Sequence, residues 1–256
     1  IFDTMTRREE AYHRQIPDSS ETDENEHASI HDGIRSKEAD IRSYLHYDLY
    51  RRLNFIDHFL PYDESMDSFS KNRHTELGDF VEAHYERTQV KKNGRPGITL
   101  ERQGTLRING ERLPVSIQKQ FALPEKGASL SVDYRLDFNT KPNNVMFGVE
   151  LNLGLGSGYA DDSFISIPGR YLSDPHLAST GVEENVRDIV LTIGWMPLII
   201  KMKLSLPTTL WRFPIETVSQ SEGGVERTYQ NTCLVPVWNL ENSGREFEVN
   251  ITMGVE

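Results

Sequence analysis

Most of the chain alternates hydrophobic and polar residues with a period of two, which is typical of β-strands with one buried face. This alternation runs through residues 113–123, 130–138, 189–193 and 247–255, and Lys119 is an exception to it. Short segments rich in glycine, asparagine and proline separate the alternating stretches and favour turns. The pattern predicts ten to twelve strands, which are too many for one flat open sheet.

The strands are expected to form an all-β fold, a large antiparallel β-sandwich. No long helical pattern lies between them, so parallel strands joined by helical crossovers are not expected. Two antiparallel sheets packed face to face are the arrangement that buries the hydrophobic faces. We assign the sandwich to residues 41–256 and expect one short helix within it, at residues 66–77, capped by Asp67 or Ser68.

Residues 1–40 form a different kind of segment, a helical lead-in followed by an acidic linker. Within Phe2–Ile16, Thr6 and Glu9 have the spacing of a capping box, and Pro17 ends the predicted helix. Residues 18–26 contain five acids and no base. That composition favours a solvated linker or a mobile loop.

Composition and charge exclude several classes of function. The 256-residue chain is 37% hydrophobic and 26% charged, as in ordinary soluble domains, and lacks the run of about 20 apolar residues that a membrane helix needs. A net charge of −11 repels phosphate backbones, so we expect no nucleic-acid partner. Cys233, the single cysteine, excludes an internal disulfide. With no signal peptide in the sequence, we expect a cytoplasmic location.

The stretch Asn144–Tyr159 offers the first candidate ligand site. Glu150 and Asn152 are expected on one strand face, between Gly148 and Gly154. Glycines beside polar groups leave open space that suits a polar ligand such as a sugar. The alternative is that both side chains hydrogen-bond to neighbouring groups in a crowded interior.

Two further residues are candidates for sugar binding, each with a structural alternative. His84 lies on a polar face with Glu82 and Glu86, and pairing with a carboxylate would tune it for proton transfer. Otherwise it is an exposed or structurally bonded histidine. Trp211 offers an aromatic face for stacking on a sugar ring, but such residues are also common core anchors.

The remaining motifs indicate neither a metal nor a cofactor. No histidine pair lies on a predicted helix with the i, i+4 spacing of a zinc site, and GxSxG does not occur. The loop GLGSG lacks the lysine of a phosphate-binding loop. Asp161, Asp162 and Asp174 lack the ordered spacing of a calcium loop. The residues alone therefore favour a domain that binds or supports over one that catalyses.

Four blocks carry a resemblance to a known family. They are DTMTRREEAYH (Asp3–His13), YDLYRRLNFIDHFL (Tyr47–Leu60), ELGDF (Glu76–Phe80) and FGVELNL (Phe147–Leu153), in this order. Together they resemble the C-terminal region of α-amylases and 4-α-glucanotransferases of glycoside hydrolase family 57. The resemblance implies a sandwich similar to galactose mutarotase, packed on a seven-stranded (β/α) barrel. It also implies that the catalytic glutamate and aspartate lie in that barrel, upstream of Ile1.

The resemblance implies an accessory domain of a retaining enzyme that cleaves or transfers α-1,4-linked glucans. Its partners would be the barrel of the same parent chain and the α-glucan itself, and the fragment alone would be non-catalytic. Four residues in the first block are candidates for the interface with the barrel: Arg7, Arg8, Tyr12 and His13. The alternative is an exposed helix with internal ion pairs, such as Arg7 with Glu10.

Two other functions remain open at this point. One is an independent carbohydrate-binding module with an exposed aromatic platform. The other is a mutarotase-like sugar epimerase, which would need a carboxylate base and a histidine acid on one concave face. Glu150 and His84 are the candidates for that pair.

Overall fold

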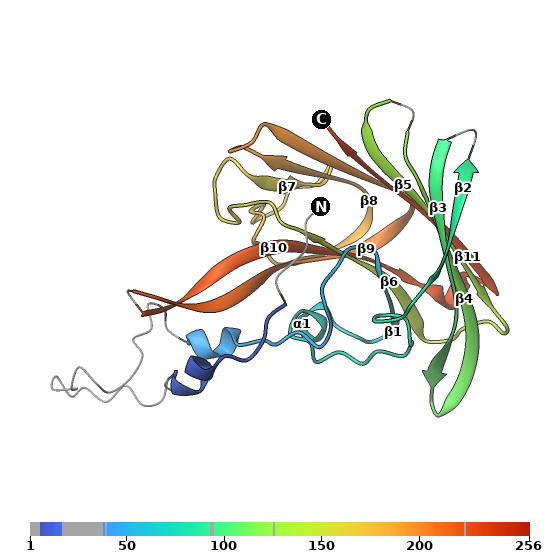
Figure 1. Cartoon of the computed structure of the whole chain (residues 1–256), viewed down its shortest axis with the longest axis horizontal. Helices are drawn as coiled ribbons and strands as arrows, with labels where there is room; N and C mark the ends of the chain where they lie inside the picture. Colours follow the sequence, from blue (N-terminus) through green and yellow to red (C-terminus); the bar gives the residue numbers. More distant parts are fainter. Residues whose placement is uncertain (1–5, 17–37, 39, 93–94, 125, 223) are drawn as a thin grey trace.

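The computed structural model describes residues 6–16, 38, 40–92, 95–124, 126–222 and 224–256, which form mainly β-strands (Figure 1). The strands are β1 (Ile56–Pro61), β2 (Glu86–Lys92), β3 (Arg95–Ile108), β4 (Glu111–Ala122), β5 (Ala128–Phe138), β6 (Val145–Leu153), β7 (Phe164–Ser166), β8 (Gly181–Ile193), β9 (Leu198–Ser221), β10 (Gly224–Asn239) and β11 (Glu246–Val255). The helical elements are η1 (Ala11–Gln15), η3 (Ile41–Tyr44), α1 (Met66–Ser70) and η4 (Leu240–Asn242).

The described strands pair antiparallel in one continuous order, β1-β6-β10-β9-β11-β5-β4-β3-β2, with β8 beside β9 and β7 beside β8. Strand β9 connects the two halves of this order. Its residues 209–221 pair with β10, whereas residues 200–204 pair with β11. One long strand therefore contributes to both layers.

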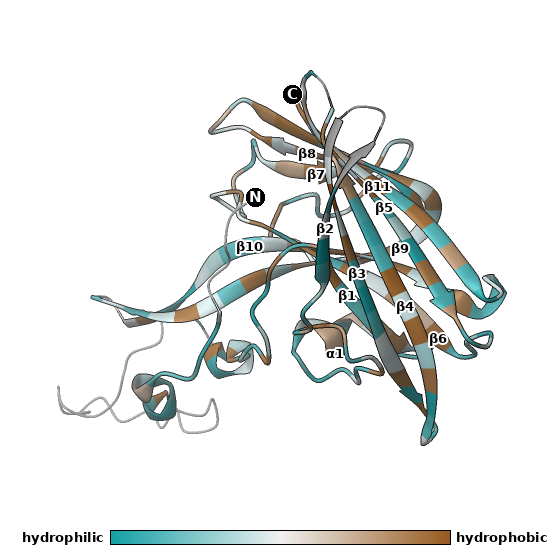
Figure 2. Cartoon of the chain, turned by 45° about the vertical axis from the view of Figure 1, so that its right-hand side comes forward, coloured by the Kyte–Doolittle hydropathy of each residue, from teal (hydrophilic) through white to brown (hydrophobic). Residues whose placement is uncertain are grey.

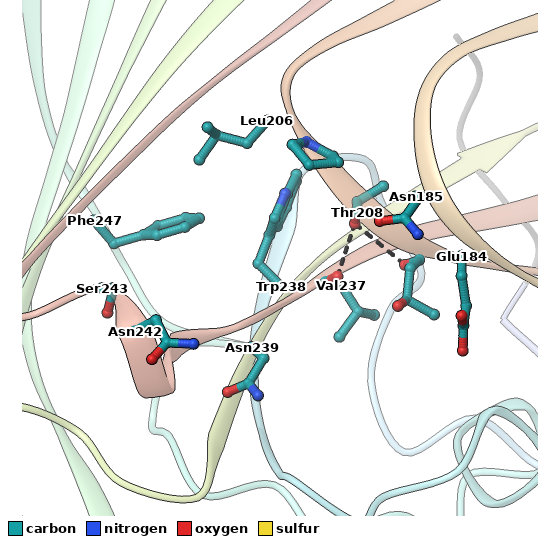
Figure 3. A pocket seen from close by; sticks show the side chains of 12 residues that line it. Glu184, Asn185, Leu206, Thr208, Val237, Trp238, Asn239, Asn242, Ser243 and Phe247 are labelled. Atoms are coloured by element: carbon teal, nitrogen blue, oxygen red, sulfur yellow. Dashed lines mark hydrogen bonds between the residues drawn. The ribbon is translucent and has the colours of Figure 1, made fainter.

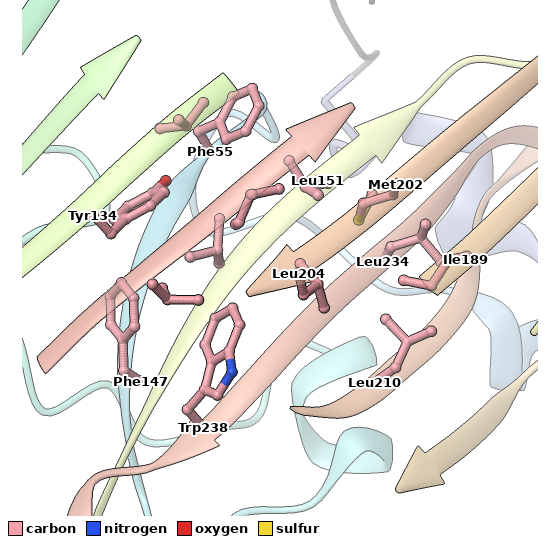
Figure 4. Packing of buried hydrophobic residues seen from close by; sticks show 14 of the residues in the cluster. Phe55, Tyr134, Phe147, Leu151, Ile189, Met202, Leu204, Leu210, Leu234 and Trp238 are labelled. Carbon is pink, nitrogen blue, oxygen red and sulfur yellow. The ribbon is translucent and has the colours of Figure 1, made fainter. Parts of the chain in front are cut away.

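The two halves pack face to face around an aromatic core (Figure 4). Phe147 of β6 lies 5.8 Å from Tyr134 of β5 between ring centroids, although β5 and β6 are not neighbours in the sheet order. The Phe147 ring also contacts Trp238 at 6.1 Å and Phe247 at 6.0 Å. Figure 2 shows alternating hydrophobic and hydrophilic residues along β4, one of the strands that the sequence pattern predicted. The all-β antiparallel prediction is confirmed.

One layer contains β1, β6, β10 and residues 209–221 of β9. Its outer face, which points away from the aromatic core, is buried as well. Phe69 of α1 packs on Trp211 of β9 at 5.6 Å, in a second cluster with Met146 and Val235. Every residue of β6 is buried as a result. This outer cover is built by the chain before β1 and by the segment that contains α1 (Figure 1).

The helical predictions were only partly right. Residues 6–10 lie outside any helix, and η1 is a single 3-10 turn in which the Glu10 N–H donates to Nδ1 of His13, in place of a Thr6–Glu9 capping box. Helix α1 is shorter than the predicted 66–77, and its cap is Ser65, whose Oγ accepts from Ser68 N at 3.1 Å. The acidic linker lies outside the described residues, so the division at residue 40 stays a prediction. None of the described helices has the length and apolar character of a membrane span.

Replacing Phe147 with alanine should destabilise the domain by about 4 kcal/mol, because the fully buried ring contacts both layers and would leave a cavity. Leu123→Ala is the control, since Leu123 is 52% exposed and its truncation should change stability by about 0.5 kcal/mol or less. Urea unfolding followed by far-UV circular dichroism measures both. Equal midpoints for the two variants would contradict this account of the core.

Candidate functional site: a buried ionic cluster beneath the N-terminal segment

Glu150 on the outer face of β6 is fully buried and accepts four hydrogen bonds from side chains. Arg52 Nη1 donates to its Oε1 at 2.9 Å, and Asn152 Nδ2 donates to the same oxygen at 2.6 Å. Tyr50 Oη at 2.6 Å and His58 Nε2 at 3.0 Å bind Oε2. Burial raises the pKa of the Glu150 carboxyl, but Arg52 and His58 outweigh it and hold the pKa far below its usual range. The carboxylate is therefore charged and compensated inside the protein.

His58 on β1 bridges two carboxylates. Its Nε2 faces Glu150, and its Nδ1 lies 2.9 Å from Oε2 of Glu76. Burial alone lowers the pKa of the imidazole, but the two carboxylates overcome this and raise the pKa to about 9. At neutral pH both ring nitrogens carry a proton, and each donates to a carboxylate.

Arg52 extends the cluster towards the N-terminus. Its side chain is fully buried, and Nε donates to Asp48 Oδ1 at 2.7 Å. Asp48 in turn binds Arg7, through the Arg7 Nη2 at 2.7 Å and the backbone N–H at 2.8 Å. Burial raises the pKa of Asp48, but its arginine partners prevail and lower it. Arg7, Asp48, Arg52 and Glu150 thus form a continuous ionic chain from the N-terminal segment to β6.

A second set of contacts holds the N-terminal segment on β9. Tyr12 Oη donates to the carbonyl of Val218 at 3.0 Å. His13 Nε2 lies 3.1 Å from the same carbonyl, and because Nδ1 accepts from Glu10 N–H, the proton is placed on Nε2. Ile16 is buried in a small apolar cluster that includes Val218. Residues 6–16 are therefore attached at two separate places.

The interface candidates divide between these contacts and solvent. Arg7, Tyr12 and His13 bind groups of the sandwich itself, and Arg8 is exposed. Arg7 is buried and pairs with Asp48, so the alternative of an exposed helix with an Arg7–Glu10 pair was wrong. Contact of these four residues with a barrel stays a prediction.

The sugar-binding candidates lie in different environments. Glu150 and Asn152 are fully buried, and a Cβ added to Gly148 would meet Val235 at 3.4 Å, so the expected open space above this face is filled. The crowded-interior alternative describes both residues. Trp211 is 4% exposed and packs on Phe69, which leaves no free ring face for a sugar.

His84 is the exposed member of the set. Because Glu150 is enclosed, the two do not share an accessible face on which an acid–base pair would hold a sugar.

Lys119, the exception in the strand pattern, turns inward and binds Asp57 at 2.7 Å and the Phe55 carbonyl at 2.9 Å. Tyr85 also donates to Asp57, which completes a second buried ionic cluster on the other side of β1.

Sequence reasoning missed Arg52, His58 and His74. Arg52 and His58 lie in the second resemblance block, but their partner Glu150 is more than 90 residues away, and no local spacing reveals such a pairing. Among the described residues, His58, His74 and Glu76 form a group able to hold a metal, with one ligand atom from each within 4.8 Å of the others.

A surface pocket of about 420 Å³ lies beside the end of β10 (Figure 3). The rings of Trp238 and Phe247 and the amides of Asn239 and Asn242 line it. The indole Nε1 of Trp238 is buried and has no hydrogen-bond partner within the described part of the chain. An aromatic edge beside amides is a lining that suits a ligand with both apolar and hydroxyl surfaces.

Comparisons with known proteins agree on one family. The sequence profile described as "Alpha-amylase/4-alpha-glucanotransferase, C-terminal" matches residues 1–251. A 4-alpha-glucanotransferase of Thermococcus kodakarensis is 29% identical over 240 residues, which are 92% of this chain and 32% of that protein. Alpha-amylase 1 of Dictyoglomus thermophilum is 28% identical over 246 residues, which are 94% and 33% of the two chains. The chain spans about a third of the length of these relatives.

Solved structures support the same assignment. The crystal structure of the 4-alpha-glucanotransferase of Thermococcus litoralis superposes with a TM-score of 0.73 at 25% identity, over 98% of this chain and 32% of that one. A galactose mutarotase-like protein of Clostridium acetobutylicum gives a TM-score of 0.50 at 11% identity, over 87% and 85% of the two chains. The latter likeness shows the fold alone, and it confirms the galactose mutarotase-like architecture.

Asp48→Asn should destabilise the domain by about 3 kcal/mol at neutral pH, because Arg7 and Arg52 lose the charge that compensates them. The pKa of Asp48 is lower in the folded state than its ordinary 3.8, so its contribution is complete above about pH 5 and is lost as the pH falls through the folded-state value. The difference in Tm between Asp48→Asn and the unmodified chain should therefore shrink between pH 5 and pH 3. A difference that stays constant would contradict the ionic chain.

Proposed function

The chain belongs to the family of C-terminal domains of α-amylases and 4-α-glucanotransferases, and on this premise we propose that it is the accessory β-sandwich of an α-1,4-glucan hydrolase or glucanotransferase. Because the chain spans about a third of its relatives, we assign the chemistry to the remainder of the parent protein. The proposed partner is a catalytic barrel that precedes this domain in the same polypeptide. Its task would be to cleave α-1,4 links with retention, using a pair of carboxylates.

The observation that carries the proposal is the ionic chain from Arg7 to Glu150. It attaches the first described residues to the centre of a strand that is buried on both faces. A segment held in this way cannot swing freely, because its departure would leave Asp48 buried without its outer partner. Such an attachment suits a domain that must hold an upstream neighbour in a fixed orientation.

The environment of Glu150 supports a structural role for this domain. A catalytic carboxylate must reach a glycosidic oxygen or an anomeric carbon. Glu150 is completely enclosed, and both its oxygens accept from the cluster side chains. The residue that most resembles a sugar-site carboxylate in the sequence is thus committed to holding the fold.

A second candidate function, contact with glucan, is favoured by the pocket at Trp238. Its polar lining is formed by the amides of Asn239 and Asn242, beside the rings of Trp238 and Phe247, which are 4% and 8% exposed. Side-chain amides both donate and accept hydrogen bonds, which suits the hydroxyl groups of a sugar. In the parent enzyme this pocket would extend the glucan-binding surface.

The purified chain should neither release reducing sugar from maltoheptaose nor redistribute its chain lengths, whereas the full-length parent should do the first as a hydrolase or the second as a transferase. In the full-length parent, Arg7→Ala should lower the Tm of the enzyme and speed proteolysis near the domain junction, because Asp48 loses its outer partner. Arg14→Ala is the matched control, because its side chain is exposed and its ion pair with Glu9 lies on the surface. Turnover by the purified chain would refute the accessory role, and equal proteolysis rates for the two variants would refute the attachment.

Glucan binding at the pocket should appear as a change in tryptophan fluorescence on titration with maltoheptaose, with a dissociation constant in the millimolar range typical of weak polar sites. Asn242→Ala should weaken the response about tenfold by removing an exposed amide from the lining. His84→Ala tests the other exposed candidate and should leave the response unchanged. If His84→Ala alone abolishes binding, the pocket assignment is wrong.

A further inference from the structure

The group formed by His58, His74 and Glu76 has a geometry that the ionic cluster does not require. We propose that these three residues bind one divalent cation of the borderline class, for which Zn²⁺ is the best match. The site would join β1 to the segment that follows α1. This inference goes beyond the accessory function and does not depend on it.

The ligand atoms lie near the spacing of a small four-coordinate ion, whose ligands are at most about 4.2 Å apart, so the His74 ring would move inward on binding. His58 Nδ1 and Glu76 Oε2 are 2.9 Å apart, and the His74 ligand atom completes a group within 4.8 Å. An ion about 2.0–2.1 Å from each ligand would fit between the first two atoms after a small outward shift. Two imidazoles and one carboxylate form a donor set that zinc prefers, whereas Ca²⁺ and Mg²⁺ prefer oxygen alone.

His74 supplies the observation that points to a ligand. Its Nδ1 is buried and has no hydrogen-bond partner in the described part of the chain. The centroid of the His74 ring lies 4.5 Å from that of Phe69 and 5.9 Å from that of His58. An imidazole nitrogen without a hydrogen-bond partner is available to coordinate a cation. A buried acceptor without a donor costs free energy that a bound cation would recover.

The other two ligands are already oriented by neighbouring groups. Glu76 Oε1 accepts from the backbone N–H groups of Phe59 at 2.8 Å and Gly78 at 3.1 Å, which turns Oε2 towards His58. On the far side of the imidazole, Glu150 accepts from Nε2. A carboxylate behind a coordinating histidine fixes the ring and increases its basicity, as in many zinc sites.

Binding would exchange a proton for the ion. The proton on His58 Nδ1, which now bridges to Glu76, would pass to solvent, and the cation would take its place between the same two atoms. His74 and Glu76 are partly exposed and provide a path for entry, with water as the fourth ligand. The remaining His58 proton, on Nε2, stays directed at Glu150.

The test uses the tag-free chain, stripped with EDTA and dialysed. Calorimetric titration with Zn²⁺ should give one site per chain, and a hundredfold excess over the dissociation constant should raise the Tm by about 5 °C. Co²⁺ should give the visible absorption of a four-coordinate site. Ca²⁺ at the same concentration should leave the Tm unchanged.

His74→Phe is the informative variant, because phenylalanine keeps the ring contact with Phe69 and removes both nitrogens. Its affinity for Zn²⁺ should fall at least tenfold, whereas His84→Phe, at an exposed histidine, should bind as the unmodified chain does. Glu76→Gln provides a second variant that keeps the contacts to Phe59 and Gly78. The proposal is overturned if the unmodified chain binds Zn²⁺ with a dissociation constant weaker than about 100 micromolar. It is also overturned if His74→Phe binds with unchanged affinity.

Discussion

The negative charge of Glu150 is the constraint around which the outer layer is organised. A carboxylate with no exposed surface must be compensated within the protein, and isolated it would be prohibitively unstable. Its donors come from the segment before β1, from β1 and from β6 itself. Those elements must therefore be in place together. Asp48 pairs with both Arg52 and Arg7, so the N-terminal segment belongs to the same set.

The sequence predicted the sandwich because its strands obey a simple physical rule. In β4, β5 and β11 one face meets the core and the other meets solvent, so the period of two is visible. The rule also placed Glu150 and Asn152 on one face of β6, correctly, since both join the same buried cluster. It could not show that the second face is covered too, since the cover consists of irregular chain without periodicity.

The candidate site was less accessible to sequence reasoning for a related reason. Glu150 and Asn152 stood out as polar residues between glycines, and this signal was real, but its cause was a compensating arginine and histidine about a hundred residues away. The resemblance blocks did contain those partners, because Tyr47–Leu60 includes Arg52 and His58. Similarity of short sequence blocks identifies the family, but it does not show which side chains contact one another. Only the three-dimensional pairing of β1 with β6 reveals that.

The long strand β9 has a consequence for how the domain comes apart. Because its 24 residues belong to both layers, neither layer has a complete set of backbone partners without it. Partial opening that peels away one layer would expose the other along the same strand. The two layers should accordingly behave as one cooperative foldon, and slow amide exchange should reach a common limit on either side of the strand's midpoint.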